Sequence, residues 1–135
     1  MIYLLDTNVC VSYLRGTDRE RLEARLNATN FGDIALCSVV KAELLYGAAR
    51  SQHPEKNHAQ LQRFFSGFPS LAFEDEAAAA YGTLRAALEA SGTPIGPNDL
   101  MIAAIALASG LVLVTHNTTE FNRVPGVVVE DWHLP

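Results

Sequence analysis

Four acidic residues stand where surface charges are unusual: Asp6, Glu43, Asp99 and Glu120. Asp6 ends a short apolar run, and open parallel sheets bind their ligands at the carboxyl ends of strands. Asp99 opens an apolar helical segment, and Glu120 follows a second apolar run. Groups of carboxylates bind hard divalent cations, which activate water against phosphodiesters. Metal-assisted hydrolysis is therefore the chemistry that these residues predict.

Glu43 is the most informative of the four. On a helix its neighbours three and four positions away are Val39, Val40, Tyr46 and Gly47, all uncharged. A carboxylate among apolar neighbours is costly unless it is paired or binds a cation. An exposed strip on an otherwise apolar helix is the competing interpretation.

Each of the other acids also has an ordinary interpretation when taken alone. Asp6 and Asp99 could be helix N-caps, and Glu120 a solvated loop residue. Together in one cleft, however, four carboxylates cannot all stay ionised without compensation, which Mg²⁺ or Mn²⁺ supplies. Polar residues at the same strand ends could orient these acids, with capping or turn formation as their alternative role: Thr7, Ser38 and Asn117.

Other side chains that could bind a metal or stack on a base are predicted to have structural roles or to lie at the surface. The histidines are scattered without ligand spacing and are predicted to be surface or loop residues: His53, His58, His116 and His133. Phe64, Phe65 and Trp132 are predicted to pack in the core or at an interface, not to stack on bases.

The hydrophobic pattern alternates short apolar runs with helical periodicity. Strands are expected at 2–5, 34–36, 71–73 and 111–114, with a weaker one at 127–129. Helices are expected at 8–14, 18–28, 38–50, 54–65, 75–90 and 99–108, with Asp18, Ser38, Asp75 and the pair Asn98 and Asp99 as caps. This order predicts an α/β fold with a mostly parallel sheet of four to five short strands and helices on both faces, in one domain over 1–135.

Composition narrows the function classes. Hydrophobic residues make up 49% and charged residues 19% of the 135 positions, which is typical of a globular chain. The two cysteines form no disulfide framework, so a reducing, cytoplasmic setting is expected.

The uncharged stretch 100–119 is broken at Ser109 and Gly110 and is too short for a membrane helix. The net charge of −5 argues against a generic nucleic-acid binder, but basic residues concentrate in the first half and could form a local basic rim.

Four segments, in order along the chain, resemble the PIN domain family. They are 5–8 (LDTN), 38–47 (SVVKAELLYG), 92–104 with Asp99, and the end of the chain from 113 to 132. The last segment is similar to the VapC toxins of type II toxin–antitoxin modules. The resemblance spans nearly the whole chain.

The resemblance implies a PIN-like three-layer α/β/α fold and a Mg²⁺-dependent endoribonuclease that cuts structured RNA, often tRNA in its anticodon stem-loop. VapC-like proteins are usually homodimers, inhibited by a VapB-type antitoxin whose C-terminal arm occupies the groove leading to the acids. Asp6, Glu43 and Asp99 carry over as metal ligands. Asn117 stands where many PIN domains have an aspartate, so Glu120 is favoured over Asn117 for the fourth position of the site. The C-terminal third resembles members that act on initiator tRNA.

Two other functions compete with this one. A non-catalytic PIN-like module that binds RNA or a partner would retain three destabilising acids without using them. A phosphatase with Asp6 as nucleophile would require a second aspartate at position 8, where the chain has Asn8, and a late lysine that it lacks.

Overall fold

The computed structural model describes residues 1–134 and contains one five-stranded sheet in which every pairing is parallel. The strands are β1 (Tyr3–Leu5), β2 (Ile34–Cys37), β3 (Ser70–Leu71), β4 (Val112–Val114) and β5 (Val129–Glu130), in the spatial order β3-β2-β1-β4-β5. β1 is central, and Leu5 pairs with Val114 of β4. Asp6 therefore emerges beside Thr115 at the carboxyl edge of the sheet.

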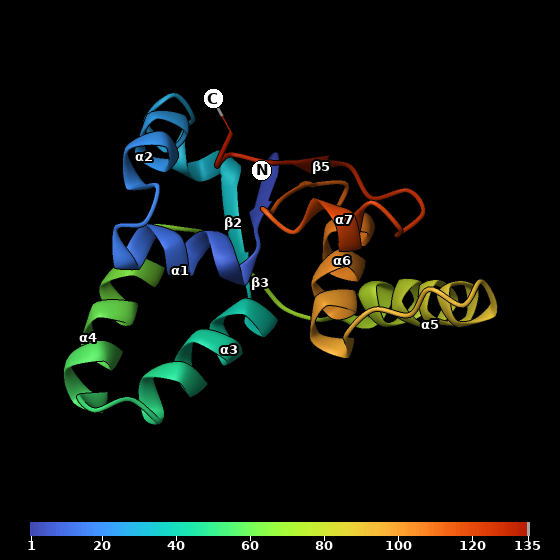
Figure 1. Cartoon of the computed structure of the whole chain (residues 1–135), viewed down its shortest axis with the longest axis horizontal. Coiled ribbons are helices and arrows are strands. Elements are labelled where there is room, and N and C mark those ends of the chain that lie inside the picture. Colours follow the sequence, from blue (N-terminus) through green and yellow to red (C-terminus); the bar gives the residue numbers. More distant parts are fainter. Residues whose placement is uncertain (135) are drawn as a thin grey trace.

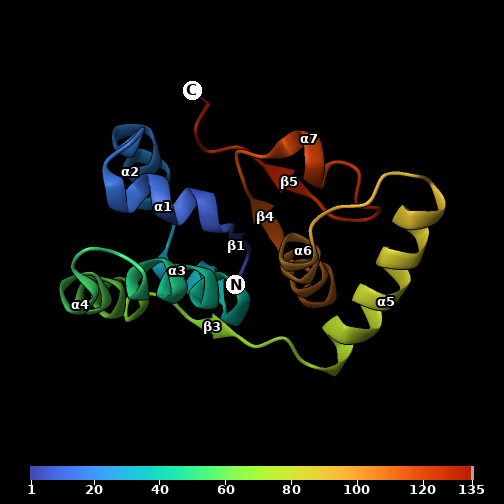
Figure 2. The same cartoon turned by 60° about the horizontal axis from the view of Figure 1, so that its bottom comes forward.

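Helices cover both faces of this sheet (Figures 1 and 2). Because parallel crossovers are right-handed, connections that move in opposite directions along the sheet lie on opposite faces. One group comprises α1 (Thr7–Arg15), α2 (Arg19–Asn27), α3 (Ser38–Ala49) and α4 (Pro54–Phe65). The other comprises α5 (Asp75–Ala90), α6 (Pro97–Ser109) and the short α7 (Thr118–Phe121); a 3₁₀ turn, Phe31–Asp33, precedes β2. The predicted three-layer α/β/α class is confirmed.

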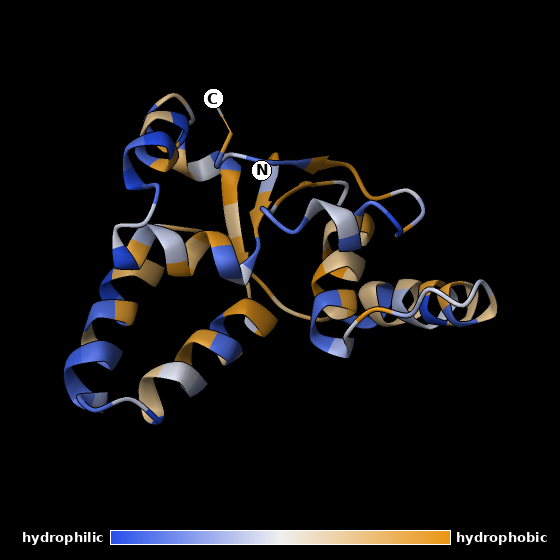
Figure 3. Ribbon diagram, in the orientation of Figure 1, coloured by the Kyte–Doolittle hydropathy of each residue, from blue (hydrophilic) through white to orange (hydrophobic). Residues whose placement is uncertain are grey.

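The core lies between the sheet and its helices, and Figure 3 shows hydrophobic residues gathered on the strands and along α6. Five consecutive residues of α6, 102–106, are buried, because this helix packs between the sheet and α5. Trp132 is 1% exposed and packs edge-on against Tyr3, with ring centroids 5.1 Å apart. This confirms that Trp132 is a core residue. No helix within residues 1–134 is long and apolar enough to span a membrane.

Several predicted boundaries were wrong by a few residues. The third strand is Ser70–Leu71, not 71–73, and the fifth is Val129–Glu130, because the register of β5 places Glu130 opposite Val114. α7 and the 3₁₀ turn were not predicted; both are too short to show a periodic pattern.

Asp18 is at the N-cap position of α2 as predicted, but the other predicted caps were wrong, and one error matters for function. Asp18 lies in a left-handed conformation without a capping bond, and Cys37 and Glu74, not Ser38 and Asp75, precede α3 and α5. α6 begins at Pro97 after Gly96, so Asn98 and Asp99 lie inside its first turn. Proline suits that first position because it lacks the N–H that would go unbonded. The carboxylate of Asp99 is therefore not used as a cap.

Candidate active site

Asp6 lies at the centre of the carboxyl edge and is only 2% exposed. Its Oδ1 accepts a hydrogen bond from the backbone N–H of Thr7 (2.8 Å), and its Oδ2 accepts one from the Thr115 hydroxyl (2.8 Å). Asp6 is thus a helix cap and also a member of the acidic group. Burial raises its pKa, and the charges of Glu43 and Glu120 raise it further, although both hydrogen bonds act in the opposite direction.

Glu43 reaches the same edge from α3. Its Oε1 accepts a hydrogen bond of 2.6 Å from the hydroxyl of Thr7, the residue after Asp6. The side chain is half-buried, and its charge raises the pKa of both Asp6 and Asp99. Glu43 therefore faces the other acids and does not form an exposed strip.

Asp99 has the most perturbed carboxyl of the group. Its pKa is raised from 3.8 to about 7, first by burial and then by the negative charges of Asp6, Glu120 and Glu43. All three neighbouring groups that raise this pKa by their charge are carboxylates. The pocket therefore concentrates negative charges. Without a bound cation, their repulsion is reduced because Asp99 keeps a proton near neutral pH.

Glu120 completes the group from α7. Its Oε2 accepts a 2.6 Å hydrogen bond from the Asn117 side chain, and its Oε1 accepts one of 3.3 Å from the N–H of Gly96. A protonated Asp99 can donate to Glu120, and this interaction helps to raise the pKa of Asp99. Asn117 and Glu120 are therefore not alternatives for one position, because Asn117 holds the carboxylate of Glu120.

Thr115 is a polar residue that sequence reasoning missed. Its side chain is fully buried, donates to Asp6 and accepts a 3.0 Å hydrogen bond from the N–H of Asn117. A threonine directly after an apolar strand was the available signal. Ser38, by contrast, donates to the backbone carbonyl of Leu71 at 3.4 Å and not to a carboxylate.

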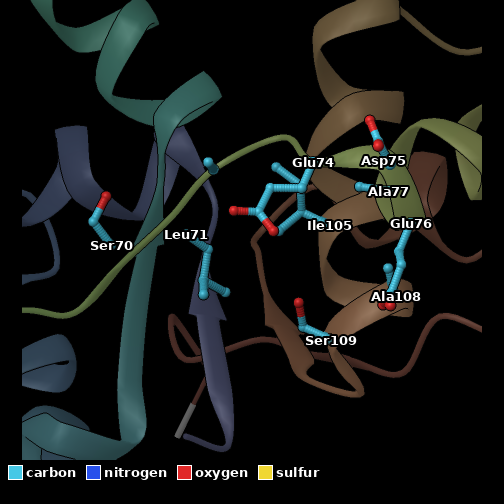
Figure 4. A pocket seen from close by; sticks show the side chains of 10 residues that line it. Ser70, Leu71, Glu74, Asp75, Glu76, Ala77, Ile105, Ala108 and Ser109 are labelled. Carbon is cyan, nitrogen blue, oxygen red and sulfur yellow. The ribbon is translucent and has the colours of Figure 1, made fainter.

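Two hollows adjoin the site, and Glu43 is the one of the four acids that lines them. The first is lined by Thr7, Ser38, Glu43, Tyr46, Asn98 and Met101. The second runs between α1, α3 and α4 and combines apolar with polar residues, including Val11, Leu14, Arg15, Asn57 and Leu61. A third hollow, lined by residues of β3, α5 and α6, contains none of the four site acids (Figure 4).

His116 is an exposed loop residue, as predicted, but the interpretation of His133 as a surface residue was wrong. His133 is 5% exposed and buried, not a surface residue, and its ring lies 4.5 Å from that of His116. The fold brings both beside Asp131, so that one candidate ligand atom from each of the three lies within 4.8 Å of the others. Positions 116 and 133 lie too far apart in sequence for any spacing rule to reveal this group.

The four acids are suited to a divalent cation. All their ligand atoms are carboxylate oxygens, which hard ions such as Mg²⁺ and Mn²⁺ prefer. Burial and the neighbouring negative charges both raise the pKa of Asp99, so both oppose its ionised form. A cation in contact with these oxygens would displace the proton and satisfy that charge.

Comparison with known proteins decides the family. The PIN domain family model matches residues 3–127. The chain belongs to the PIN domain family. A "tRNA(fMet)-specific endonuclease VapC" of Salmonella typhimurium is 41% identical over 130 residues, which cover 96% of this chain and 97% of that protein. "Ribonuclease VapC2" of Rickettsia felis is 41% identical over 133 residues, with 98% of each chain covered.

Solved structures agree with this placement. This PIN domain superposes on a chain of the DNA-bound VapBC structure from Salmonella typhimurium with a TM-score of 0.93, at 40% identity and with 98% of each chain covered. The corresponding value for VapBC2 of Rickettsia felis is 0.88, at 41% identity, with coverage of 98% and 99%. The predicted membership among the VapC ribonucleases is confirmed, and nucleases with a PIN domain depend on metal ions.

The raised carboxyl pKa values predict how the stability of this PIN domain changes with pH in EDTA. The folded chain retains a proton on Asp99 between pH 3.8 and about 7, whereas the unfolded chain releases it. Stability therefore falls as pH rises through that window and is lowest above it; Asp6 acts in the same direction.

Thermal unfolding at pH 5 and pH 8 measures this effect. After allowance for solvent screening we expect a loss on the order of 1 kcal/mol, or about 4 °C in Tm, at the higher pH. Saturating Mg²⁺ should restore the loss at pH 8. A Tm in EDTA that is equal or higher at pH 8 contradicts the prediction.

A second prediction concerns Thr7, whose hydroxyl holds Glu43. Thr7→Val is expected to lower kcat by about tenfold and to change KM little, since groups that orient metal ligands affect activity by about 10–100-fold. Thr7→Ser keeps the hydroxyl and should retain activity. Thr17→Val, in the exposed turn before α2, is the matched control. Steady-state cleavage of RNA measures all three, and an unchanged kcat in Thr7→Val would remove this role.

Proposed function

We propose that this chain is the toxin of a type II toxin–antitoxin pair and acts as a Mg²⁺-dependent endoribonuclease on structured RNA, with tRNA as the principal substrate. The observation that carries the proposal is the convergence of Asp6, Glu43, Asp99 and Glu120, with the pKa of Asp99 raised to about 7. Like charges at this density serve a cation-dependent reaction and otherwise only destabilise the fold.

In the proposed mechanism, Asp6, Glu43 and Asp99 would hold the ion. When bound, Mg²⁺ supplies positive charge that activates water and offsets the charge of the scissile phosphate. Thr115 and the N–H of Thr7 fix both oxygens of Asp6, and the Thr7 hydroxyl fixes Glu43. Asn117 and Gly96 hold Glu120 beside Asp99, where its carboxylate can orient the attacking water or accept its proton.

The substrate class follows from the relatives. The Salmonella typhimurium and Shigella flexneri proteins, 41% and 42% identical to this chain, are both named tRNA(fMet)-specific endonucleases. We propose the same class, with initiator tRNA first among the candidates. The hollow beside Glu43 includes Arg15, Asn57 and Gln60, which could bind phosphate and ribose groups despite the net charge of −5.

A VapB-type antitoxin is the proposed partner, because the similar solved structures are VapBC complexes. The hollow between α1, α3 and α4 offers apolar side chains beside Glu43 that suit an inhibitory peptide arm. We also propose a homodimer and a cytoplasmic location, where tRNA and the antitoxin are found.

Cleavage of a total tRNA pool tests the proposal. The purified chain is incubated with tRNA in Mg²⁺ and in EDTA, cut sites are mapped, and the product ends are identified. Attack by water predicts a 5′-phosphate and a 3′-hydroxyl, with cleavage in Mg²⁺ only. A non-catalytic module would bind RNA and leave it intact.

Two results would contradict the proposal. Cleavage that persists in EDTA and yields 2′,3′-cyclic phosphates would indicate attack by the RNA's own hydroxyl, without a metal. Absence of any cut in tRNA or other structured RNA, with folded protein and Mg²⁺ present, would favour the non-catalytic module.

A further inference from the structure

The loop after β4 and the C-terminal segment carry a second group of metal-binding side chains, separate from the four acids. It consists of His116, Asp131 and His133. The Nδ1 of His116 lies 3.0 Å from Asp131 Oδ2, and the Nδ1 of His133 lies 3.6 Å from Asp131 Oδ1. The two imidazole rings are tilted by 32° with their centroids 4.5 Å apart, so both present a nitrogen to the same carboxylate.

The buried histidine of this group lacks a partner. His133 is 5% exposed, and among the described residues its Nδ1 is the one buried side-chain polar atom without a hydrogen bond. A buried nitrogen in this state is costly, and native folds nearly always satisfy such groups. Because the atom faces Asp131 and His116, a ligand between the three side chains would satisfy it.

We propose that His116, Asp131 and His133 form a Zn²⁺ site. Zinc binds imidazole nitrogen and carboxylate oxygen at about 2.0–2.2 Å, which places tetrahedral ligand atoms about 3.4 Å apart. The nitrogen–oxygen separations are 3.0 Å to one oxygen of Asp131 and 3.6 Å to the other, and one ligand atom from each residue lies within 4.8 Å of the others, so the three groups are close to this spacing. Two imidazoles and one carboxylate favour zinc and similar transition metals over Mg²⁺, which prefers the all-oxygen acid group.

The fold holds these ligands in place before any metal binds. The N–H of Thr115 donates to the carbonyl of Glu130 (3.0 Å), which continues the β4–β5 pairing and sets His116 beside Asp131. The backbone N–H of His133 donates to Asp131 Oδ1 at 2.9 Å, and Arg21 donates to the carbonyl of His133 at 3.0 Å. Only small side-chain adjustments are therefore needed to close the site around an ion.

The position of the site indicates what zinc would do. His116 is exposed and lines a hollow with Asn8, Ser12, Asn117 and His133, so a fourth coordination position is open to water. His116 immediately precedes Asn117, which holds Glu120. Bound zinc would fasten the C-terminal segment to the loop that supports this acid, and so stabilise one side of the acid group.

Calorimetric titration of tag-free protein with Zn²⁺, in excess Mg²⁺ to occupy the acids, tests the site. We expect one zinc per chain and a Tm that rises with Zn²⁺. His116→Gln should weaken zinc binding by more than about tenfold, since even outer groups change metal affinity by about 10–100-fold. Asp131→Asn is the second variant, because its amide oxygen can still accept the N–H of His133. His58→Gln, at an exposed position on α4, is the control and should bind zinc as the unmodified chain does.

The outcomes separate this site from the acid group. Loss of zinc binding in His116→Gln and Asp131→Asn, with retention in Asp6→Asn and His58→Gln, supports the proposal. Visible absorption of the Co²⁺-substituted chain, absent in His116→Gln, would support it independently. The proposal is overturned if no zinc binds, if His116→Gln binds it as tightly as the unmodified chain, or if Asp6→Asn is the variant that loses it. In those cases the group is only a hydrogen-bonded pair, His116 and Asp131, beside a buried histidine.

Discussion

Asp6→Asn is expected to lower the rate of RNA cleavage by about 10³-fold, or about 4 kcal/mol, while the chain remains folded. The carboxylate of Asp6 is the innermost of the four and is fixed through both oxygens. Asparagine has the same shape and keeps one oxygen for the N–H of Thr7, while its amide can donate to the hydroxyl of Thr115. The substitution therefore removes charge and a metal ligand without emptying the site.

Single-turnover cleavage of a labelled tRNA measures this effect, and circular dichroism confirms the fold. Asp75→Asn is the matched control, because Asp75 is an exposed aspartate at the start of α5 and lies outside the site. It should cleave at the rate of the unmodified chain. If Asp6→Asn kept more than about a tenth of the activity, a difference of only about 1.4 kcal/mol, Asp6 would not be a metal ligand of the reaction.

Asp99→Asn is the substitution with the second largest expected effect. It removes a proposed ligand and the carboxyl whose pKa is raised to about 7. We expect cleavage to fall by about 10²–10³-fold, equivalent to about 3–4 kcal/mol. We also expect the variant to lose most of the decrease in Tm between pH 5 and pH 8 in EDTA, because the proton that causes it is no longer bound.

These two readouts distinguish a ligand from a structural residue. Asp75→Asn, which replaces an exposed aspartate in the first turn of α5, should retain both the activity and the pH dependence of Tm. If Asp99→Asn lost activity but kept the full pH dependence of Tm, Asp99 would not be the group that titrates near neutral pH.

The sequence predicts the sheet well because its signal is local and strong. The run Ile2 to Leu5 is apolar throughout, as expected for a strand buried on both faces, and it forms the central β1. The pattern at 111–114 likewise gives β4. β3 and β5 were placed less well, since each has only two residues and its bounds depend on the neighbour with which it pairs.

The site acids can also be predicted from the sequence, but from the residues that surround them and not from a repeating pattern. Glu43 is informative because its helical neighbours are uncharged, and a carboxylate among such neighbours is costly unless it is paired or binds a cation. What the sequence could not give was the link between side chains that are distant in the chain. The bond from Thr7 to Glu43, the burial of Thr115 against Asp6 and the meeting of His116 with His133 all arise from tertiary packing.

Helix caps were misassigned because capping residues also serve other roles. Aspartate and serine at a helix start favour a cap on propensity alone. In α6, however, Gly96 and Pro97 form the start, and Asp99 faces the other acids. Propensity alone could not distinguish a capping aspartate from one placed in the first turn for chemistry.

Thermal unfolding of the unmodified chain and of Asp6→Asn, each in EDTA and in Mg²⁺, tests most directly whether the four carboxylates form a site that a divalent cation stabilises. The Tm of the unmodified chain should rise with Mg²⁺, by the equivalent of about 2.7 kcal/mol when the ion is at a hundred times its Kd. Asp6→Asn should be at least as stable as the unmodified chain in EDTA and should respond little to Mg²⁺. A Tm of the unmodified chain that does not change with Mg²⁺, together with a less stable Asp6→Asn in EDTA, would contradict the account.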